Sequence, residues 1–510
     1  TGEVRRRGVE AGHAHRHGRV AAVAYPGPVT TSLPAPLVAV QEQAVQRLVD
    51  SEPRIVALGE RFAAAGFELS AVGGCVRDSV SGDMADVDID LATDAPPQDT
   101  VALLSGWADT VWDVGIRWGT VGARKGDRAF EITTYRADVY DGETRKPDVT
   151  FGTTLSGDLM RRDFTINAMA IRLPELRFVD EHRGLIDLAA GRLRTPGRPT
   201  DSFRDDPLRM MRAARFVSQL GVSIEPDTYA AISQMADRLQ IVSPERIRDE
   251  LVRLLLGEFP RRGLAVLTES GLAAVMLPEL PALQLEIDEH HRHKDVYEHS
   301  LTVLEQAIQL EDGGPDLTLR LAAVLHDIGK PRTRRHESGG GVSFHHHEVV
   351  GARMAAKRLR ALHFAKTEID DVSRLVELHL RFHGYGSGEW TDSAVRRYVR
   401  DAGDLLPRLH KLTRADCTTR NQRRARALQR SYDSLEERID RLAAAEELSA
   451  IRPELDGNQI MSVLGIRPGR EVGQAYKFLL DLRLDRGPIG PQAATKELTE
   501  WWAARQEDDQ

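Results

Sequence analysis

Two short segments decide the fold of this chain: Gly73-Gly74-Cys75-Val76-Arg77-Asp78 and, further on, Asp88-Ile89-Asp90-Leu91-Ala92-Thr93. Residues i and i+2 of a strand point to the same face, so the strand spacing places the carboxylates of Asp88 and Asp90 together. Two such carboxylates can hold two Mg²⁺ ions about 3.5–4 Å apart. The glycines let the backbone approach a triphosphate, and Arg77 adds a cation. The pattern predicts metal-dependent nucleotidyl transfer.

A second motif is Arg161-Arg162-Asp163-Phe164-Thr165-Ile166-Asn167-Ala168-Met169. Two cations followed by an acceptor suit the triphosphate and the sugar hydroxyls of a nucleotide, and an asparagine can hydrogen-bond in both directions. A plain charge run would instead be the solvated start of a helix.

A third motif is Asp205-Asp206-Pro207-Leu208-Arg209-Met210-Met211-Arg212-Ala213-Ala214-Arg215-Phe216. On a helix, Asp206 and Arg209 would stand on one face. Cytosine and adenine each present an amino donor beside a ring-nitrogen acceptor, and guanine and uracil present the reverse. A carboxylate beside a guanidinium therefore suits C and A, while each unpaired group left by a wrong base costs about 1–3 kcal/mol. The alternative is an ordinary helix ion pair.

In this order and at this spacing, the three motifs resemble the class II tRNA nucleotidyltransferase and bacterial poly(A) polymerase family. The resemblance implies a polymerase-β-like head in which Asp88 and Asp90 are catalytic and bind Mg²⁺. Asp86 lies two residues before Asp88 and could form a similar pair with it. The Leu-Ala-Thr that follows Asp90 instead identifies Asp88 and Asp90 as the pair that matches the family. The resemblance further implies a nucleotide-binding set: Gly73, Gly74, Arg77, Arg161, Arg162, Asp163, Asn167, Asp206, Arg209, Arg212 and Arg215.

The roles of two further carboxylates stay open. The family usually has Glu-Asp where this chain has Asp205-Asp206, which leaves the role of Asp205 in doubt. Glu131 lies in the predicted strand 130–135 and is either a further carboxylate near the metals or an exposed strand residue.

A second constellation follows the three motifs. Twelve of the 17 histidines lie between His290 and His383, which marks a separate chemical module. Imidazole and carboxylate ligands suit divalent transition metals, and a bridging aspartate could hold two ions. The order H…HD…H…H…D resembles the HD metal-dependent phosphohydrolase superfamily and implies a site for a transition metal or Mg²⁺. Its ligands would be His299, His326, Asp327, His347, His379 and Asp416.

Composition indicates an ordinary globular protein. Hydrophobic residues make up 41% of the 510 residues, and no apolar run approaches the length of a membrane span. The two cysteines, Cys75 and Cys417, are too few for a disulfide framework and indicate a reducing, cytoplasmic location. The net charge of −8 argues mildly against a nucleic-acid partner, but it is the local field of clustered cations that attracts phosphate.

Hydrophobic periodicity predicts an α+β chain: a head with a small mixed sheet, then an all-helical neck and an HD-type helical domain. Strand character is expected over 67–72, 87–91, 111–114, 120–124 and 130–135. The predicted organisation is a disordered tail (1–36), the head (37–190), a neck with the base-selecting segment (191–285), the HD domain (286–435) and a helical C-terminal region (436–510).

Two basic segments are candidates for RNA contact. Residues 414–430 include Arg420, Arg423, Arg424, Arg426 and Arg430, and a helix carrying them would make a basic stripe or an ordinary solvated face. The Arg- and His-rich tail is the weaker candidate.

The motifs favour a template-independent enzyme that adds CCA to the 3′ end of tRNA from CTP and ATP, with possible phosphohydrolase activity in the HD domain. A poly(A) polymerase shares all three head motifs and remains the first alternative. The second is a metal-dependent phosphohydrolase whose head only binds nucleotide. The oligomeric state stays open.

Overall fold

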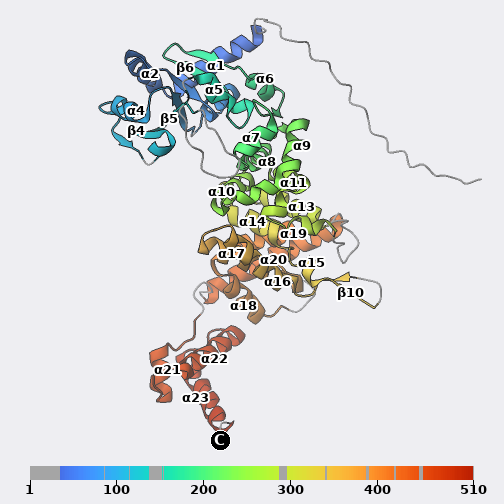
Figure 1. The fold of residues 1–510 in the computed structure, drawn as a ribbon. Helices are drawn as coiled ribbons and strands as arrows, with labels where there is room; N and C mark the ends of the chain where they lie inside the picture. The colour runs from blue at the N-terminus through green and yellow to red at the C-terminus, as the bar shows by residue number, and fades with distance from the viewer. Residues whose placement is uncertain are drawn as a thin grey trace, which may run out of the picture.

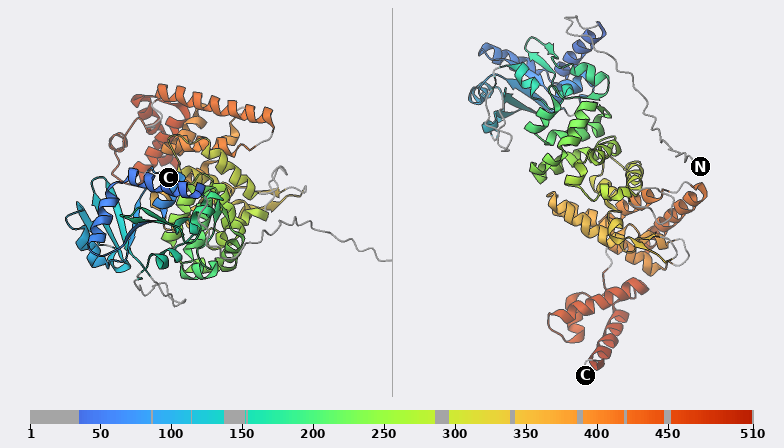
Figure 2. Two further views of the ribbon diagram at one scale, coloured as in Figure 1. Left: turned by 90° about the horizontal axis from the view of Figure 1, so that it is seen from above. Right: turned by 45° about the vertical axis from the view of Figure 1, so that its right-hand side comes forward.

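The computed structural model describes residues 35–508, apart from 86, 114, 137–151, 153, 286–295, 339–341, 386–389, 419–420 and 447–451. Asp86, Arg420 and nearly all of the predicted tail lie outside the described residues. The molecule is elongated, and the chain runs from the head at one end to the C-terminal helices at the other (Figure 1; Figure 2).

The head is built on a seven-stranded mixed sheet of order β3-β4-β5-β2-β1-β6-β7. All five predicted strand regions are present as strands. Among the described strands of this sheet, only β2 and β5 run parallel, and this pairing sets Asp90 beside Glu131. The strands are β1 (Leu69–Val72), β2 (Ile89–Thr93), β3 (Thr110–Trp112), β4 (Thr120–Lys125), β5 (Arg128–Thr134), β6 (Ala170–Leu173) and β7 (Arg177–Val179).

Helices of the head pack on this sheet around a core that includes Phe62, Ile89 and Phe130. The chain enters the head through two helices, which Pro53 separates. The head helices are α1 (Ala35–Ser51), α2 (Arg54–Ala64), α3 (Gly74–Ser81), α4 (Pro97–Leu104), α5 (Leu155–Met160) and α6 (Gly184–Ala189).

Beyond residue 200 the described chain is almost entirely helical, as predicted. The neck contains α7 (Pro199–Asp205), α8 (Leu208–Leu220), α9 (Pro226–Met235), α10 (Pro244–Leu255), α11 (Pro260–Glu269) and α12 (Leu272–Met276). The HD segment contains α13 (Val296–Ile308), α14 (Leu317–Leu325), α15 (Lys330–Thr333), α16 (His347–Ala361), α17 (Lys366–Leu378), α18 (Asp392–Ala402), α19 (Leu406–Asp416) and α20 (Gln422–Glu446).

Neck and HD segment share one hydrophobic core, which continues from Phe164 through the neck to Leu442. Arg320 of α14 reinforces the junction from a buried position. Its Nη1 donates to the carbonyl oxygens of Leu255 (2.6 Å) and Gly257 (3.0 Å), and its Nη2 pairs with Glu311. The spacing between the two chemical modules is therefore fixed by continuous packing.

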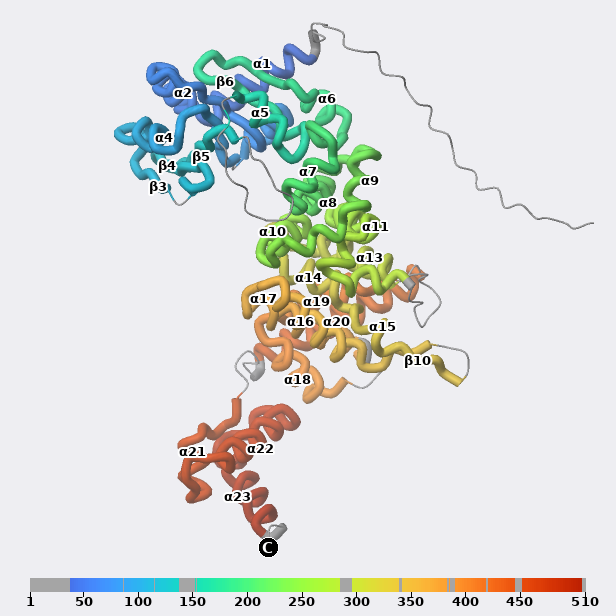
Figure 3. The backbone as a smooth tube through the Cα atoms, in the orientation of Figure 1, coloured from blue at the N-terminus to red at the C-terminus, as the bar shows by residue number. Residues whose placement is uncertain are grey.

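A separate core belongs to the last helices, α21 (Gly457–Leu464), α22 (Arg470–Arg486) and α23 (Pro491–Asp508). Figure 3 shows these helices as a separate cluster beyond α18. Arg397 of α18 pairs with Asp485 of α22 at 2.6 Å, which joins the cluster to the HD segment. None of the described helices is both long and apolar enough to cross a membrane.

Candidate functional site

The carboxylates of the first motif gather on neighbouring strands. Asp88 directly precedes β2 and is exposed, Asp90 is the second residue of β2, and Glu131 pairs with it in register on β5. Burial raises the pKa of Asp90 to about 6; among nearby charges Arg162 lowers it, whereas Glu131 and Asp88 raise it. A divalent cation would relieve this repulsion, so the residues fit a Mg²⁺ ion that keeps water and substrate phosphates as its other ligands.

The glycine turn after β1 brings the first and second motifs together. Gly73 has φ +75°, which glycine adopts without strain. A side-chain carbon at this position would lie 2.9 Å from Nη1 of Arg162 and 3.8 Å from Oδ2 of Asp90. A side chain at residue 73 would therefore displace the guanidinium group of Arg162 and would be strained by the positive φ.

Both arginines of the second motif are oriented by one buried carboxylate. Arg161 donates to Asp158 Oδ1 (2.9 Å) and Arg162 to Asp158 Oδ2 (3.0 Å). Burial would raise the pKa of Asp158, but the two guanidinium groups hold it below its usual range. Sequence reasoning missed Asp158, although its spacing of three and four residues from the arginines on a helix is a usable signal.

A polar chain joins the three motifs. Arg77 donates to Asn167 Oδ1 (2.8 Å) and Asn167 donates to Asp163 Oδ1 (3.1 Å). Asp163 Oδ2 accepts two bonds from Arg212, at 2.8 and 2.6 Å. These residues come from α3, from the second motif and from α8, so the predicted nucleotide-binding residues Arg77, Asp163, Asn167 and Arg212 form one connected network.

The prediction that Asp206 and Arg209 share a helix face is wrong. Asp206 is extended (φ −139°, ψ 101°) and follows the end of α7, and α8 begins only at Leu208. Pro207 lacks an N–H and disfavours the helical conformation at the residue before it. The two residues instead meet at the joint between helices, where Arg209 N donates to Asp206 O (3.0 Å).

Each side chain of this pair has its own support. Asp206 Oδ2 accepts from Arg246 of α10 (2.8 Å), and Arg209 Nη2 donates to the carbonyl of Arg161 (2.6 Å). Arg215, one turn beyond Arg212, is buried in the neck and donates to Glu250 (2.6 Å).

The six residues of the HD pattern form two adjacent groups: His299, His326 and Asp416, and Asp327, His347 and His379. In each group the potential ligand atoms lie within 4.8 Å of one another. His326 Nε2 lies 3.3 Å from His299 Nε2, and His347 Nε2 lies 3.2 Å from Asp327 Oδ1. Five segments of the chain converge here.

The imidazoles are oriented as metal ligands usually are. Nδ1 of His326, His347 and His379 lies 2.8, 2.8 and 2.6 Å from the carbonyl oxygen three residues earlier. A proton on Nδ1 leaves Nε2 with its lone pair free for a metal. The Nε2 atom of His379 is buried and has no hydrogen-bond partner among the residues that the structure describes. Burial, together with the charge on His326, lowers the pKa of His379 to about 3. These observations fit divalent ions.

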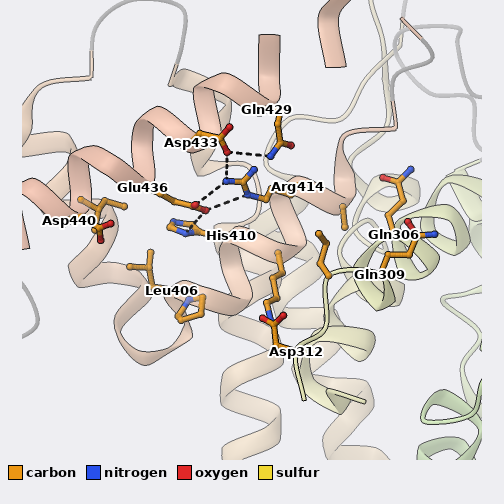
Figure 4. Close-up of a pocket in the computed structure, with 15 residues that line it drawn as sticks. Gln306, Gln309, Asp312, Leu406, His410, Arg414, Gln429, Asp433, Glu436 and Asp440 are labelled. Atoms are coloured by element: carbon orange, nitrogen blue, oxygen red, sulfur yellow. Dashed lines mark hydrogen bonds and ion pairs between the residues drawn. The ribbon is translucent and has the colours of Figure 1, made fainter. Parts of the chain in front are cut away.

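A polar groove of about 920 Å³ lies beside this centre, between α13, α19 and α20. Figure 4 shows Arg414 in its wall, between Asp433 and Glu436 of α20. Arg414 Nη2 lies 2.9 Å from each carboxylate. Because Arg414 precedes Asp416 on α19, these ion pairs brace the helix that supplies one of the six residues.

Known families match consecutive parts of the chain. Residues 69–194 match the poly A polymerase head domain, 221–283 a probable RNA- and SrmB-binding site of polymerase A, and 296–421 the HD domain. An A-adding tRNA nucleotidyltransferase of Deinococcus radiodurans is 35% identical over 432 residues, which cover 80% of this chain and 97% of the relative. The chain belongs to the class II tRNA nucleotidyltransferase family.

Other relatives within this family match over a shorter length. The CCA-adding enzymes of Limosilactobacillus fermentum and Levilactobacillus brevis are 43% and 42% identical, and the matched region spans 52% and 51% of their lengths. The crystal structure of the Bacillus stearothermophilus CCA-adding enzyme in complex with CTP has the same fold, with a TM-score of 0.65 over 90% of this chain and 99% of that one at 23% identity.

The HD cluster leads to a prediction about metal content. Asp327 lies within 3.2 Å of His326 and of His347, which belong to different groups, so Asp327→Asn should reduce binding to both. We expect up to two divalent ions per chain in the wild type and a clear loss in the variant, measured by elemental analysis after dialysis. The control variant Asp312→Asn changes an exposed aspartate outside the cluster, so its metal content should equal that of the wild type. Equal metal content in wild type and Asp327→Asn would contradict the assignment.

Proposed function

We propose that this chain adds nucleotides to the 3′ end of tRNA without a nucleic-acid template, using CTP and ATP, and that CCA is the product. The observation that carries the proposal is the polar network that joins all three motifs around Asp90 and Gly73. The likeness to CCA-adding relatives, at 43% identity over 213 residues, supports it.

In the head, Asp88 and Asp90 would hold Mg²⁺, which when bound would favour attack by the 3′-hydroxyl and neutralise the leaving pyrophosphate. Arg161 and Arg162, fixed by Asp158, would orient the triphosphate. The open turn at Gly73 admits the phosphates close to the backbone. The 3′ oxygen of the RNA then bonds to the α-phosphorus as the bond to pyrophosphate breaks.

Base selection would fall to Asp206 and Arg209. The joint between α7 and α8 carries one acceptor and one donor group within four residues. Turned toward the same base, they would match the edges of C and A and not those of G and U. The remaining predicted binding residues, Gly74, Asp163, Asn167, Arg212 and Arg215, would act by shaping and charging this surface.

A second product is favoured by a specific observation. The relative that matches over 97% of its length is named an A-adding enzyme. An Asp-Arg pair suits adenine as well as cytosine, so a chain that adds only the terminal A would use the same residues. A poly(A) product is the further alternative, since such enzymes share the head motifs.

Asp88→Ala should leave the protein folded and abolish incorporation, because Asp88 is exposed and would hold the metal. The measurement is the product formed on tRNA ending before CCA and on tRNA ending in CC, with labelled CTP and ATP. Two C and one A on the first substrate support CCA addition. A alone on the second substrate supports the A-adding alternative, and a run of A on any RNA supports poly(A). Full activity of Asp88→Ala would contradict the assignment of Asp88 as a catalytic metal ligand.

The HD cluster supports a separate hydrolytic activity on phosphate esters at RNA ends. When bound there, divalent ions would supply a water of lowered pKa. We expect phosphate release from 3′-phosphorylated or 2′,3′-cyclic RNA ends to survive Asp88→Ala and to be lost in Asp327→Ala. Release that persists in Asp327→Ala would leave the cluster a structural role.

The basic start of α20 supports contact with the RNA backbone. Residues 422–432 include four arginines and no acidic residue. Arg423, Arg426 and Arg430 are exposed and recur at helical spacing, opposite the buried Tyr432 and Leu435. In the described part of the chain, these three side chains have no acidic partner.

Replacing Arg423, Arg426 and Arg430 with Gln should weaken tRNA binding and make it less sensitive to salt. Each lost phosphate contact reduces the slope of log K against log salt by about 0.7–0.9. Arg438→Gln on the same helix removes a cation already paired with Asp392, so it should change the slope much less. A triple variant with the wild-type slope would show that the stripe is only a solvated face.

A further inference from the structure

Ser202 occupies an unusual place in the joint that carries the base-selecting pair. It lies on α7, four residues before Asp206 and seven before Arg209, and it is buried. Its hydroxyl oxygen accepts from Arg209 Nη1 at 2.8 Å. Its carbonyl oxygen accepts from the backbone N–H of Asp206 (3.2 Å) and lies 3.4 Å from Arg209 Nη1. One residue therefore contacts both members of the pair.

The contacts of Arg209 leave part of its guanidinium group available. Nη1 is directed to Ser202 and Nη2 to the carbonyl oxygen of Arg161. A guanidinium has five N–H donors in a rigid plane, so two fixed points determine the direction of the others. Loss of either point would let the plane rotate about the end of a long, flexible side chain.

Asp206 is held from a different side. Its Oδ1 accepts from Leu208 N (3.1 Å) and its Oδ2 from Arg246 (2.8 Å). The carboxylate is thus set by α8 and α10, whereas the guanidinium is set by α7 and the second motif. The angle between donor and acceptor, which a base edge must match, depends on both supports.

We propose that Ser202 is a positioning residue for nucleotide selection: its hydroxyl fixes the plane of Arg209 so that Arg209 and Asp206 together read the edge of the incoming base. This inference rests on the proposed function. Ser202 touches neither substrate nor metal, and it acts only through Arg209.

The test is the selectivity of Ser202→Ala. The variant should add the correct nucleotide with nearly the wild-type kcat. Its preference for CTP and ATP over UTP and GTP, measured as the ratio of kcat/KM values, should fall about tenfold, the size expected for one hydrogen bond to a charged group. Ser202→Thr keeps the hydroxyl oxygen and should restore most of the preference.

A matched control is Ser218→Ala. Ser218 is also buried, and its hydroxyl also makes one hydrogen bond, to the carbonyl of Leu254 (2.6 Å), but it lies further along α8, beyond Arg215. It should lower thermal stability without changing the nucleotide preference. If Ser202→Ala fails to fold where Ser218→Ala folds, Ser202 has a structural role and the proposal is overturned.

The double variant separates positioning from general damage. In an Arg209→Ala background the plane of the guanidinium no longer exists, so adding Ser202→Ala should cause no further loss of selectivity. Independent, additive losses would overturn the proposal. An enzyme that incorporates no nucleotide at all would contradict the proposed function instead. An active and selective wild type with an equally selective Ser202→Ala would contradict only this inference.

Discussion

The ion pair between the buried Asp163 and the half-buried Arg212 is the interaction on which the catalytic end depends. Asp163 is almost fully buried, and burial alone would favour its neutral form, yet Arg212 and the Asn167 hydrogen bond hold its pKa well below the usual range. Oδ1 of Asp163 accepts a hydrogen bond from Asn167, whose own side-chain oxygen accepts one from Arg77. A buried carboxylate with one partner removed is strongly destabilised. The pair therefore fixes the neck helix α8 against the second motif of the head.

That constraint also bears on the proposed role of the neck in base selection. Arg209 stands in the first turn of α8, the helix that carries Arg212, and Asp206 directly precedes that helix across Pro207. Anchoring Arg212 to Asp163 therefore also fixes the start of α8 against the second motif. Arg209 is also joined directly to the second motif, because its Nη2 donates to the carbonyl oxygen of Arg161. In the proposed function, base selection and catalysis would share this one connection, and small displacements of aligned groups would be costly.

The HD centre depends on a different kind of constraint. Its six residues come from five segments, and each imidazole is turned by a contact at Nδ1. The helices that carry them belong to the core shared with the neck. The centre can therefore keep its geometry as part of a continuous helical body, and α19 is held further by the ion pairs of Arg414.

By itself, the sequence determined the elements and the chemistry. Strand alternation predicted the five strand regions, and the motif residues and the HD order pointed to the residue types that meet in space, because local periodicity and residue chemistry are written in short stretches. The tertiary structure alone decided which groups pair: Asp158 beneath both arginines, Arg246 on Asp206, and Ser202 on Arg209. It also decided that Pro207 breaks the predicted helix, and that neck and HD segment share one core. These contacts join residues from different elements, and they depend on packing and burial, which no local pattern records.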